Sequence, residues 1–157
     1  MNASALSVKG RALRWLAQRE HSRAELERKL ARVVEDAPEA SAQAQIAAAL
    51  DELAAKGLIS EARVAESVLS AQGRRFGVRR LKQTLQAKGL DASLVASTLQ
   101  QARATEFERA REVWRRRYGE PAADAAGRAK QMRFLAGRGF DTEVSRRVVQ
   151  ARDDDGD

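Results

Sequence analysis

The sequence lacks residue types and patterns that several classes of protein require. Its 157 residues include no cysteine, one histidine and two prolines. Without cysteine the chain has neither disulfide bonds nor thiolate ligands for a structural zinc ion. No apolar run reaches the roughly 20 residues of a membrane-spanning helix, and residues 1–10 lack the apolar core of a signal peptide. These absences predict a cytoplasmic protein.

Residues arranged for catalysis are also missing. His21 is the only histidine and directly precedes Ser22, a candidate helix cap, where a side chain usually has a packing role. Acidic residues often stand four positions from a base, as Glu25 does from Lys29, a spacing that stabilises helices. There is no glycine-rich phosphate loop, metal-ligand cluster or serine–histidine arrangement. We therefore predict no enzymatic activity, no catalytic residues, no cofactor and no metal.

Aromatic residues are scarce, at 4%, whereas 43% of the chain is hydrophobic and 32% is charged. Apolar residues recur at helical spacings, as in Leu26, Leu30 and Val33, and no segment alternates with period two. Ser22 with Glu25 forms a capping box, and glycine following a cation predicts helix ends at Gly57, Gly89 and Gly139. The pattern predicts an all-α fold of nine helices, with residues 34–45 and 119–127 as loops.

One segment recurs at a fixed spacing. Lys88-Gly89-Leu90-Asp91 matches Arg138-Gly139-Phe140-Asp141, 50 residues later, and Leu26 and Leu30 match Leu81 and Leu85 at an offset of 55. Periods of this size are typical of helical arrays. We predict three tandem three-helix repeats that form an elongated, curved array. The expected boundaries are residues 1–59, 60–103 and 104–152, followed by an acidic tail at 153–157.

The charge balance favours a polyanionic partner. Lys and Arg number 29 against 22 acidic residues, for a formal charge of +7, and without the four acidic residues of the tail the body carries +11. The basic residues gather in three clusters that stacked repeats would align into a stripe suited to a phosphate backbone or an acidic groove. The alternative is an ordinary solvated face. The predicted binding residues are Arg23, Arg28, Lys29, Arg74, Arg75, Arg79, Arg80, Lys82, Lys88, Arg115, Arg116 and Arg117.

Three motifs in order carry a family resemblance over about residues 6–152. They are Ala12-Leu13, Arg19, His21-Ser22, Glu25-Leu26 and Lys29-Leu30; Phe76-Gly77, Arg80-Leu81, Leu85 and Lys88-Gly89-Leu90; and Lys130, Leu135 and Arg138-Gly139-Phe140. In these motifs the chain resembles the RecX family of recombination regulators. The resemblance implies three three-helix units that bind the groove of the RecA–DNA filament. It also implies modulation, mainly inhibition, of RecA ATPase, strand exchange and coprotease activity in recombination and DNA repair.

Two other functions compete with this interpretation. The first is a DNA-binding module that uses its three-helix units as helix-turn-helix elements. The segments Val78-Arg79-Arg80 and Arg23-Ala24-Glu25 offer charge but few groups that read bases, so binding to single- or double-stranded DNA should be non-specific. The second is a scaffold for some other acidic protein. In all three cases we expect a monomer that does not bind membranes.

Overall fold

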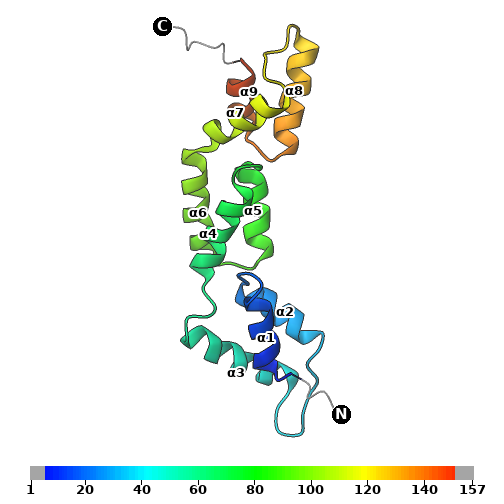
Figure 1. The fold of residues 1–157 in the computed structure, drawn as a ribbon, viewed down its shortest axis with the longest axis vertical. Helices are drawn as coiled ribbons and strands as arrows, with labels where there is room; N and C mark the ends of the chain where they lie inside the picture. Colours follow the sequence, from blue (N-terminus) through cyan, green and yellow to red (C-terminus); the bar gives the residue numbers. More distant parts are fainter. Residues whose placement is uncertain (1–5, 151–157) are drawn as a thin grey trace. The chain divides into compact units, whose positions relative to one another are not determined.

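The computed structural model describes residues 6–150, which form α-helices joined by loops and turns, with one isolated bridge between Ala37 and Ala40. The prediction of an all-α fold is confirmed. The helices, shown in Figure 1, are α1 (Val8–Leu16), α2 (Arg23–Ala31), α3 (Ala42–Ala55), α4 (Glu61–Gln72), α5 (Val78–Ala87), α6 (Ala92–Ala104), α7 (Glu106–Arg117), α8 (Ala125–Gly137) and α9 (Thr142–Gln150). Among the described residues, none of these helices is both long and apolar enough to cross a membrane. The predicted acidic tail lies outside the described residues.

By internal packing the chain divides into two compact units. The first comprises Met1–Ser67 together with Lys88–Leu90, and the second comprises Val68–Ala87 together with Asp91–Asp157. The loop after α5 therefore belongs to the first unit, although α5 itself belongs to the second. The predicted boundaries between three repeats, at residues 59 and 103, remain a prediction.

The core of the first unit lies between α1, α2 and α3, which pack against one another (Figure 1). The apolar spacing of Leu6, Leu13 and Leu16 predicts a buried stripe on the first helix, and this prediction is wrong for two of them. Leu6 and Leu13 are exposed, whereas Ala12 is fully buried. Because α1 begins only at Val8, its inner face runs through Ala12 and Leu16. The buried residues of this core are Ala12, Leu26, Leu30, Ile46, Leu50, Leu53 and Ile59.

Helix ends in the first unit mostly follow the sequence signals. The capping box of Ser22 and Glu25 is present, and Gly57 ends α3 with φ 72°. One boundary differs, because α3 begins at Ala42, inside the expected loop. Ser41 accepts a hydrogen bond from the Ala44 amide, and Asp36 accepts one of 2.6 Å from the Ala42 amide. These two oxygens satisfy amides at the start of the helix and so allow it to begin early.

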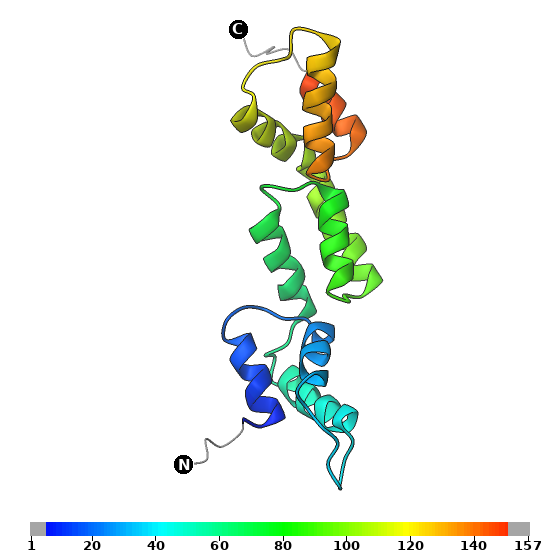
Figure 2. The same ribbon diagram turned by 90° about the vertical axis from the view of Figure 1, so that its right-hand side faces the viewer.

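The second unit has an apolar core between α7, α8 and α9, which Figure 2 shows together. The indole of Trp114 is buried there and its Nε1 donates to Gln131 Oε1 at 2.9 Å. Helix α8 begins at Ala125, two residues before the expected end of the loop, because Asp124 accepts from the Gly127 amide. Asp91 and Asp141, which precede α6 and α9, both accept hydrogen bonds from helix amides. The buried residues of this core are Ala110, Trp114, Leu135, Phe140, Val148 and Val149.

Candidate polyanion-binding surface

The turn between α4 and α5 is fixed by a partly buried arginine on α7. Arg109 donates to the carbonyls of Gly73 and Phe76, each at 2.6 Å, and to that of Ala102 at 2.8 Å. Its guanidinium therefore satisfies carbonyl oxygens at the ends of two helices, which would otherwise lack partners. Burial lowers the pKa of Arg109, and the nearby charge of Glu106 opposes this effect. Sequence reasoning did not select Arg109, because these three acceptors are backbone carbonyls. Two of these carbonyls lie more than 30 residues away along the chain.

Three guanidinium groups converge on the ring of Phe76, which lies in this turn. The guanidinium carbon of Arg80 lies 4.1 Å from the ring centroid, that of Arg75 5.3 Å and that of Arg138 6.0 Å. The guanidinium of Arg138 also lies 5.3 Å from the ring centroid of Phe134. Such distances are typical of cation–π contacts. We call Phe76, Arg75, Arg80 and Arg138 the Phe76 cluster.

The backbone around the Phe76 cluster is tied to the loop after α8. The Gly77 amide donates to the Arg138 carbonyl at 2.9 Å, and the Arg79 amide donates to the Gly139 carbonyl at 3.0 Å. A Cβ on Gly77 would overlap the Gly139 carbonyl and the Phe140 backbone, so only glycine permits this approach. The segments that hold Arg80 and Arg138 are thus fixed relative to each other by main-chain bonds.

The predicted binding residues next to Phe76 face solvent. Arg74, Arg75, Arg79, Arg80 and Lys82 are all exposed. Among residues 6–150 none of them forms an ion pair with a carboxylate, and Arg138 forms none either. Arg79 and Lys82 line a cavity of about 450 Å³ that also contains the carboxylates of Glu106, Asp141 and Glu143. The guanidinium groups of Arg75, Arg80 and Arg138 form no ion pair with a carboxylate of residues 6–150.

The predicted binding residues of the first unit have partners within the chain. Arg23 contacts Asp51 at 2.7 Å and Glu27 at 3.1 Å. Lys29 donates to His21 Nε2 at 3.1 Å and lies 4.9 Å from the ring centroid of Trp15, so its predicted pairing with Glu25 is wrong. Arg28 is exposed.

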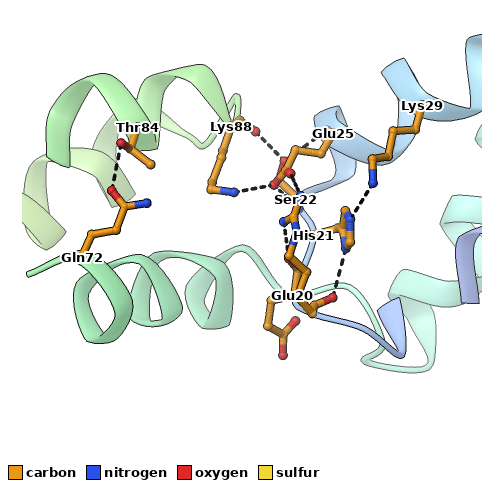
Figure 3. A network of polar contacts seen from close by, with 9 residues as sticks. Glu20, His21, Ser22, Glu25, Lys29, Gln72, Thr84 and Lys88 are labelled. Atoms are coloured by element: carbon orange, nitrogen blue, oxygen red, sulfur yellow. Dashed lines mark hydrogen bonds and ion pairs between the residues drawn. The ribbon is translucent and has the colours of Figure 1, made fainter. Parts of the chain in front are cut away.

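Glu25 is the centre of a polar network in the first unit, shown in Figure 3. Its carboxylate accepts from Arg19 at 2.9 Å, from the Ser22 amide at 3.2 Å and from Lys88 at 3.1 Å. Burial alone would raise the pKa of Glu25, but these three donors outweigh burial and lower it to about 2. Lys88, one of the predicted binding residues, is therefore neutralised within the chain.

His21 has the packing role that the sequence suggested, since its side chain is buried. Burial lowers its pKa. Lysine can only donate, so the contact with Lys29 makes Nε2 the acceptor and leaves Nδ1–H to donate to the Arg19 carbonyl at 3.0 Å. A neutral imidazole is the form that suits both contacts.

The third predicted cluster lies at the end of α7. Arg115, Arg116 and Arg117 are exposed. Arg116 pairs with Glu112 at 3.1 Å, and the guanidinium of Arg117 lies 5.6 Å from the ring centroid of Tyr118. Cations in the last turn also interact favourably with the helix dipole, so this cluster has a structural role whether or not it binds a partner.

The structure thus brings together only part of the predicted set. Arg75 and Arg80 meet at one ring, whereas the side chains of Arg23, Lys29 and Lys88 are engaged inside the first unit. Arg138 joins Arg75 and Arg80 at this ring, although sequence reasoning did not select it. The 50-residue repeat was the available signal, because it matches Arg138 to Lys88, which was selected.

Comparison with known proteins gives consistent matches along the chain. Residues 9–36 match a family model described as the first three-helix domain of RecX, and residues 104–149 match that of its third three-helix domain. A protein named Regulatory protein RecX from Leptothrix cholodnii is 51% identical over 156 residues, which cover 99% of this chain and 96% of that protein. The protein of the same name from Ralstonia nicotianae is 44% identical, with 97% and 94% covered. A crystal structure of RecX from Lactobacillus salivarius shares the fold, with a TM-score of 0.71 and 20% identity over 91% of this chain and 92% of that one.

Proposed function

This chain belongs to the RecX family of regulatory proteins, and from that premise we propose that it regulates RecA without being an enzyme. In this proposal it binds the RecA–DNA filament as a monomer in the cytoplasm. It then lowers ATP hydrolysis, strand exchange and coprotease activity by RecA. Its contacts with DNA, single- or double-stranded, are non-specific.

One observation carries the proposal beyond the family name. The second unit exposes Arg74, Arg75, Arg79, Arg80 and Lys82 without a carboxylate partner among the described residues. Cations that the chain itself does not neutralise create a positive potential that attracts a polyanion such as a nucleoprotein filament. We propose these five residues and Arg115, Arg116 and Arg117 as the main binding surface. Arg23, Arg28, Lys29 and Lys88 belong to the first unit and make a smaller contribution.

The division into repeats supports the same proposal. The two family models cover the beginning and the end of the chain, and residues between them contain α4, α5 and α6. We propose that residues 60–103 form the middle three-helix unit, flanked by units at 1–59 and 104–152. The exposed cations of the second unit then lie in the middle repeat and at the end of the first helix of the last one.

ATP hydrolysis by RecA on single-stranded DNA tests the proposal. The purified chain should lower the rate in proportion to its concentration. Unchanged hydrolysis at a several-fold excess over filament sites would contradict regulation of RecA. Retained DNA binding in the same samples would then favour a non-specific DNA-binding module.

Charge reversal tests the proposed surface. Arg75→Glu, Arg79→Glu and Arg80→Glu in one variant should weaken inhibition, because three attractive contacts become repulsive. The matched control reverses three exposed cations of α8 with Arg128→Glu, Lys130→Glu and Arg133→Glu. Glutamate is a good helix former, so both variants should remain folded. If both variants lose inhibition to the same extent, net charge, and not this surface, decides binding.

A further inference from the structure

In two places, a loop contacts the start of a helix that comes earlier in the chain. In both, a group just before that helix donates a hydrogen bond to a carbonyl of the loop. The loop after α5 contacts the start of α2, where Ser22 Oγ donates to the Lys88 carbonyl at 2.5 Å. The loop after α8 contacts the start of α5, where the Gly77 amide donates to the Arg138 carbonyl at 2.9 Å. Gly89 and Gly139 follow these carbonyls with φ of 69° and 85°. We call the first arrangement the first joint and the second the second joint.

The sequence offsets match the two joints residue by residue. An offset of 55 places Ser22 at Gly77 and Glu25 at Arg80, and an offset of 50 places Lys88 at Arg138. The first joint therefore has a carboxylate between its cations, and the second joint has an arginine at that position. Arg19, which also binds Glu25, is matched by Arg74.

Because of this substitution, no carboxylate of residues 6–150 compensates the charge of the second joint. In the first joint Glu25 accepts from both Arg19 and Lys88. In the second joint the guanidinium groups of Arg75, Arg80 and Arg138 lie within 6.0 Å of one ring centroid, and none has a carboxylate partner among the described residues. Their side-chain N–H groups make no hydrogen bond in this part of the chain either. Each guanidinium carries five donors, so the joint presents many directed donors without acceptors.

The backbone segments that carry these groups are fixed before any ligand binds. Arg109 holds the Phe76 carbonyl, Arg138 accepts from the Gly77 amide, and Gly139 accepts from the Arg79 amide. The repulsion between the three cations is therefore maintained by the backbone and cannot be relieved by moving the loops apart. An anion that enters the joint gains attraction from all three groups at little cost in ordering.

We infer that the second joint is a binding site for the phosphodiester backbone of single-stranded nucleic acid. Phosphate oxygens match the fork of a guanidinium, and one phosphate can accept two parallel N–H bonds. Phe76 is only partly buried, and the guanidinium planes that lie against its ring offer stacking surfaces for unpaired bases. An acidic peptide would supply carboxylates but no planar groups for those surfaces, so nucleic acid fits better.

This inference deepens the proposed function, on which it rests for its biological context, by assigning the DNA contact to particular residues. Its test omits RecA, so that failure of the site and failure of RecA regulation are distinguishable. The probe is a fluorescently labelled oligodeoxythymidylate, whose binding to the full chain is followed by anisotropy over a range of salt concentrations. A labelled polyglutamate peptide is the competing probe.

The site variant combines Arg80→Gln with Arg138→Gln, and the control combines Arg128→Gln with Arg133→Gln, which removes the same charge from α8. Loss of two phosphate contacts should flatten the slope of log K against log salt by about 1.4, at about 0.7 per contact on a single strand. The control should keep the slope of the unaltered chain. Equal slopes for the two variants would overturn the assignment, and tighter binding of polyglutamate than of the oligonucleotide would assign the joint to an acidic protein.

A second variant tests the site by reversing one of its charges. Arg80→Glu places a carboxylate where the first joint has Glu25, within reach of the cations that converge on Phe76. The expected result is a melting temperature at least as high as that of the unaltered chain, together with loss of oligonucleotide binding. Undiminished binding by this folded variant would contradict the inference.

Discussion

At the scale of single residues, Glu25 links three segments of the first unit. Its carboxylate accepts from Arg19, from the Ser22 amide and from Lys88, which is 63 residues away in sequence. A carboxylate so placed stabilises the folded chain only while it is charged. Glu25 is therefore a site at which pH and stability are coupled.

The pH dependence has a defined direction. The folded pKa of Glu25 is about 2, below the ordinary value of 4.5, so its contribution is complete above pH 4.5 and is lost as the pH falls toward 2. The contribution amounts to at most about 3 kcal/mol, at about 1.4 kcal/mol per pH unit. Urea unfolding of Glu25→Gln should show lower stability at pH 7 and a flatter decline between pH 4.5 and 2. The same slope in both proteins would show that other carboxylates dominate acid unfolding.

Glycines at helix ends allow a second prediction at this scale. Gly57, Gly89 and Gly139 all have positive φ, which disfavours a β-branched residue by about 1–2 kcal/mol. A Cβ at Gly89 would also overlap Ala24, and one at Gly139 would overlap the backbone of Arg80, whereas Gly57 has no atom within 4 Å. Gly89→Val and Gly139→Val should therefore cost more than Gly57→Val.

Fluorescence can assign that loss to each unit, because Trp15 packs in the core of the first and Trp114 in that of the second. Thermal melts of Gly89→Val and Gly139→Val should be read from Trp15 and Trp114 respectively, in backgrounds that retain one tryptophan. Equal melting shifts for all three valine variants would mean that the joints tolerate a side chain and that only backbone strain matters.

Local signals explain why so many residue-scale features could be predicted. The capping box at Ser22 and the glycine stops depend on neighbours within a few positions, so the sequence contains the whole interaction. The partners of Glu25 could not be predicted, because Lys88 reaches it only through tertiary packing. The i, i+4 rule pointed to Lys29, which instead contacts His21 and Trp15.

At the scale of helices, the first turn of α7 connects the starts of two other helices, α5 and α9. Glu106 is buried, and one of its oxygens accepts from the Val78 amide at the start of α5, at 3.3 Å, and from the Asp141 amide before α9, at 3.0 Å. Helix starts carry partial positive charge, which a carboxylate complements. One side chain thus satisfies two amides that belong to different helices.

Truncation of this side chain should be costly. Glu106→Ala leaves two amides without their partner, at about 1–3 kcal/mol for each, so we expect a loss of about 2–6 kcal/mol. Glu108→Ala is the matched control, since Glu108 lies in the same turn and is exposed. Chemical unfolding followed through Trp114 measures both. A loss for Glu106→Ala no larger than that of the control would show that solvent or another group replaces the carboxylate.

Helix boundaries show where element-scale prediction succeeds. Apolar periodicity located the nine helices of residues 6–150, because each buries a face at the expected spacing. It misplaced the inner face of α1, since Leu13 is apolar yet exposed and the small Ala12 is buried. Hydrophobic character alone does not distinguish these two adjacent positions. Because α2 and α3 pack against α1, the interface favours the small side chain of Ala12 over that of a leucine.

At the scale of the whole molecule, ion pairing decides which cations can serve a partner. The amino-acid sequence predicted a basic protein and the approximate positions of its basic clusters, because both depend only on which residue stands at each position. It could not show that Arg23 and Lys88 are paired with Asp51 and Glu25, since those pairs form between distant segments. Nor could it show that Arg138 joins Arg75 and Arg80 at one ring. The candidate surface is therefore smaller in the first unit and larger in the second than the sequence indicated.

The last prediction concerns the balance of charge along the chain. If about six cations contact phosphates, log K for single-stranded DNA should fall with log salt at a slope near −4, at about −0.7 per contact. Four acidic residues, Asp153, Asp154, Asp155 and Asp157, reduce the formal charge to +7, and without their charge it would be +11. Replacing all four with asparagine keeps the chain length and should tighten binding at low salt.

The gain from neutralising these residues should shrink as salt rises, because the Debye length falls from about 10 Å at 0.1 M to about 3 Å at 1 M. Oligonucleotide titrations of both proteins across this range measure it. If the four residues act only through the long-range field, the two affinities converge at high salt. A tighter affinity that persists at high salt would instead mean that the aspartates occupy the cations directly and compete with phosphate for them.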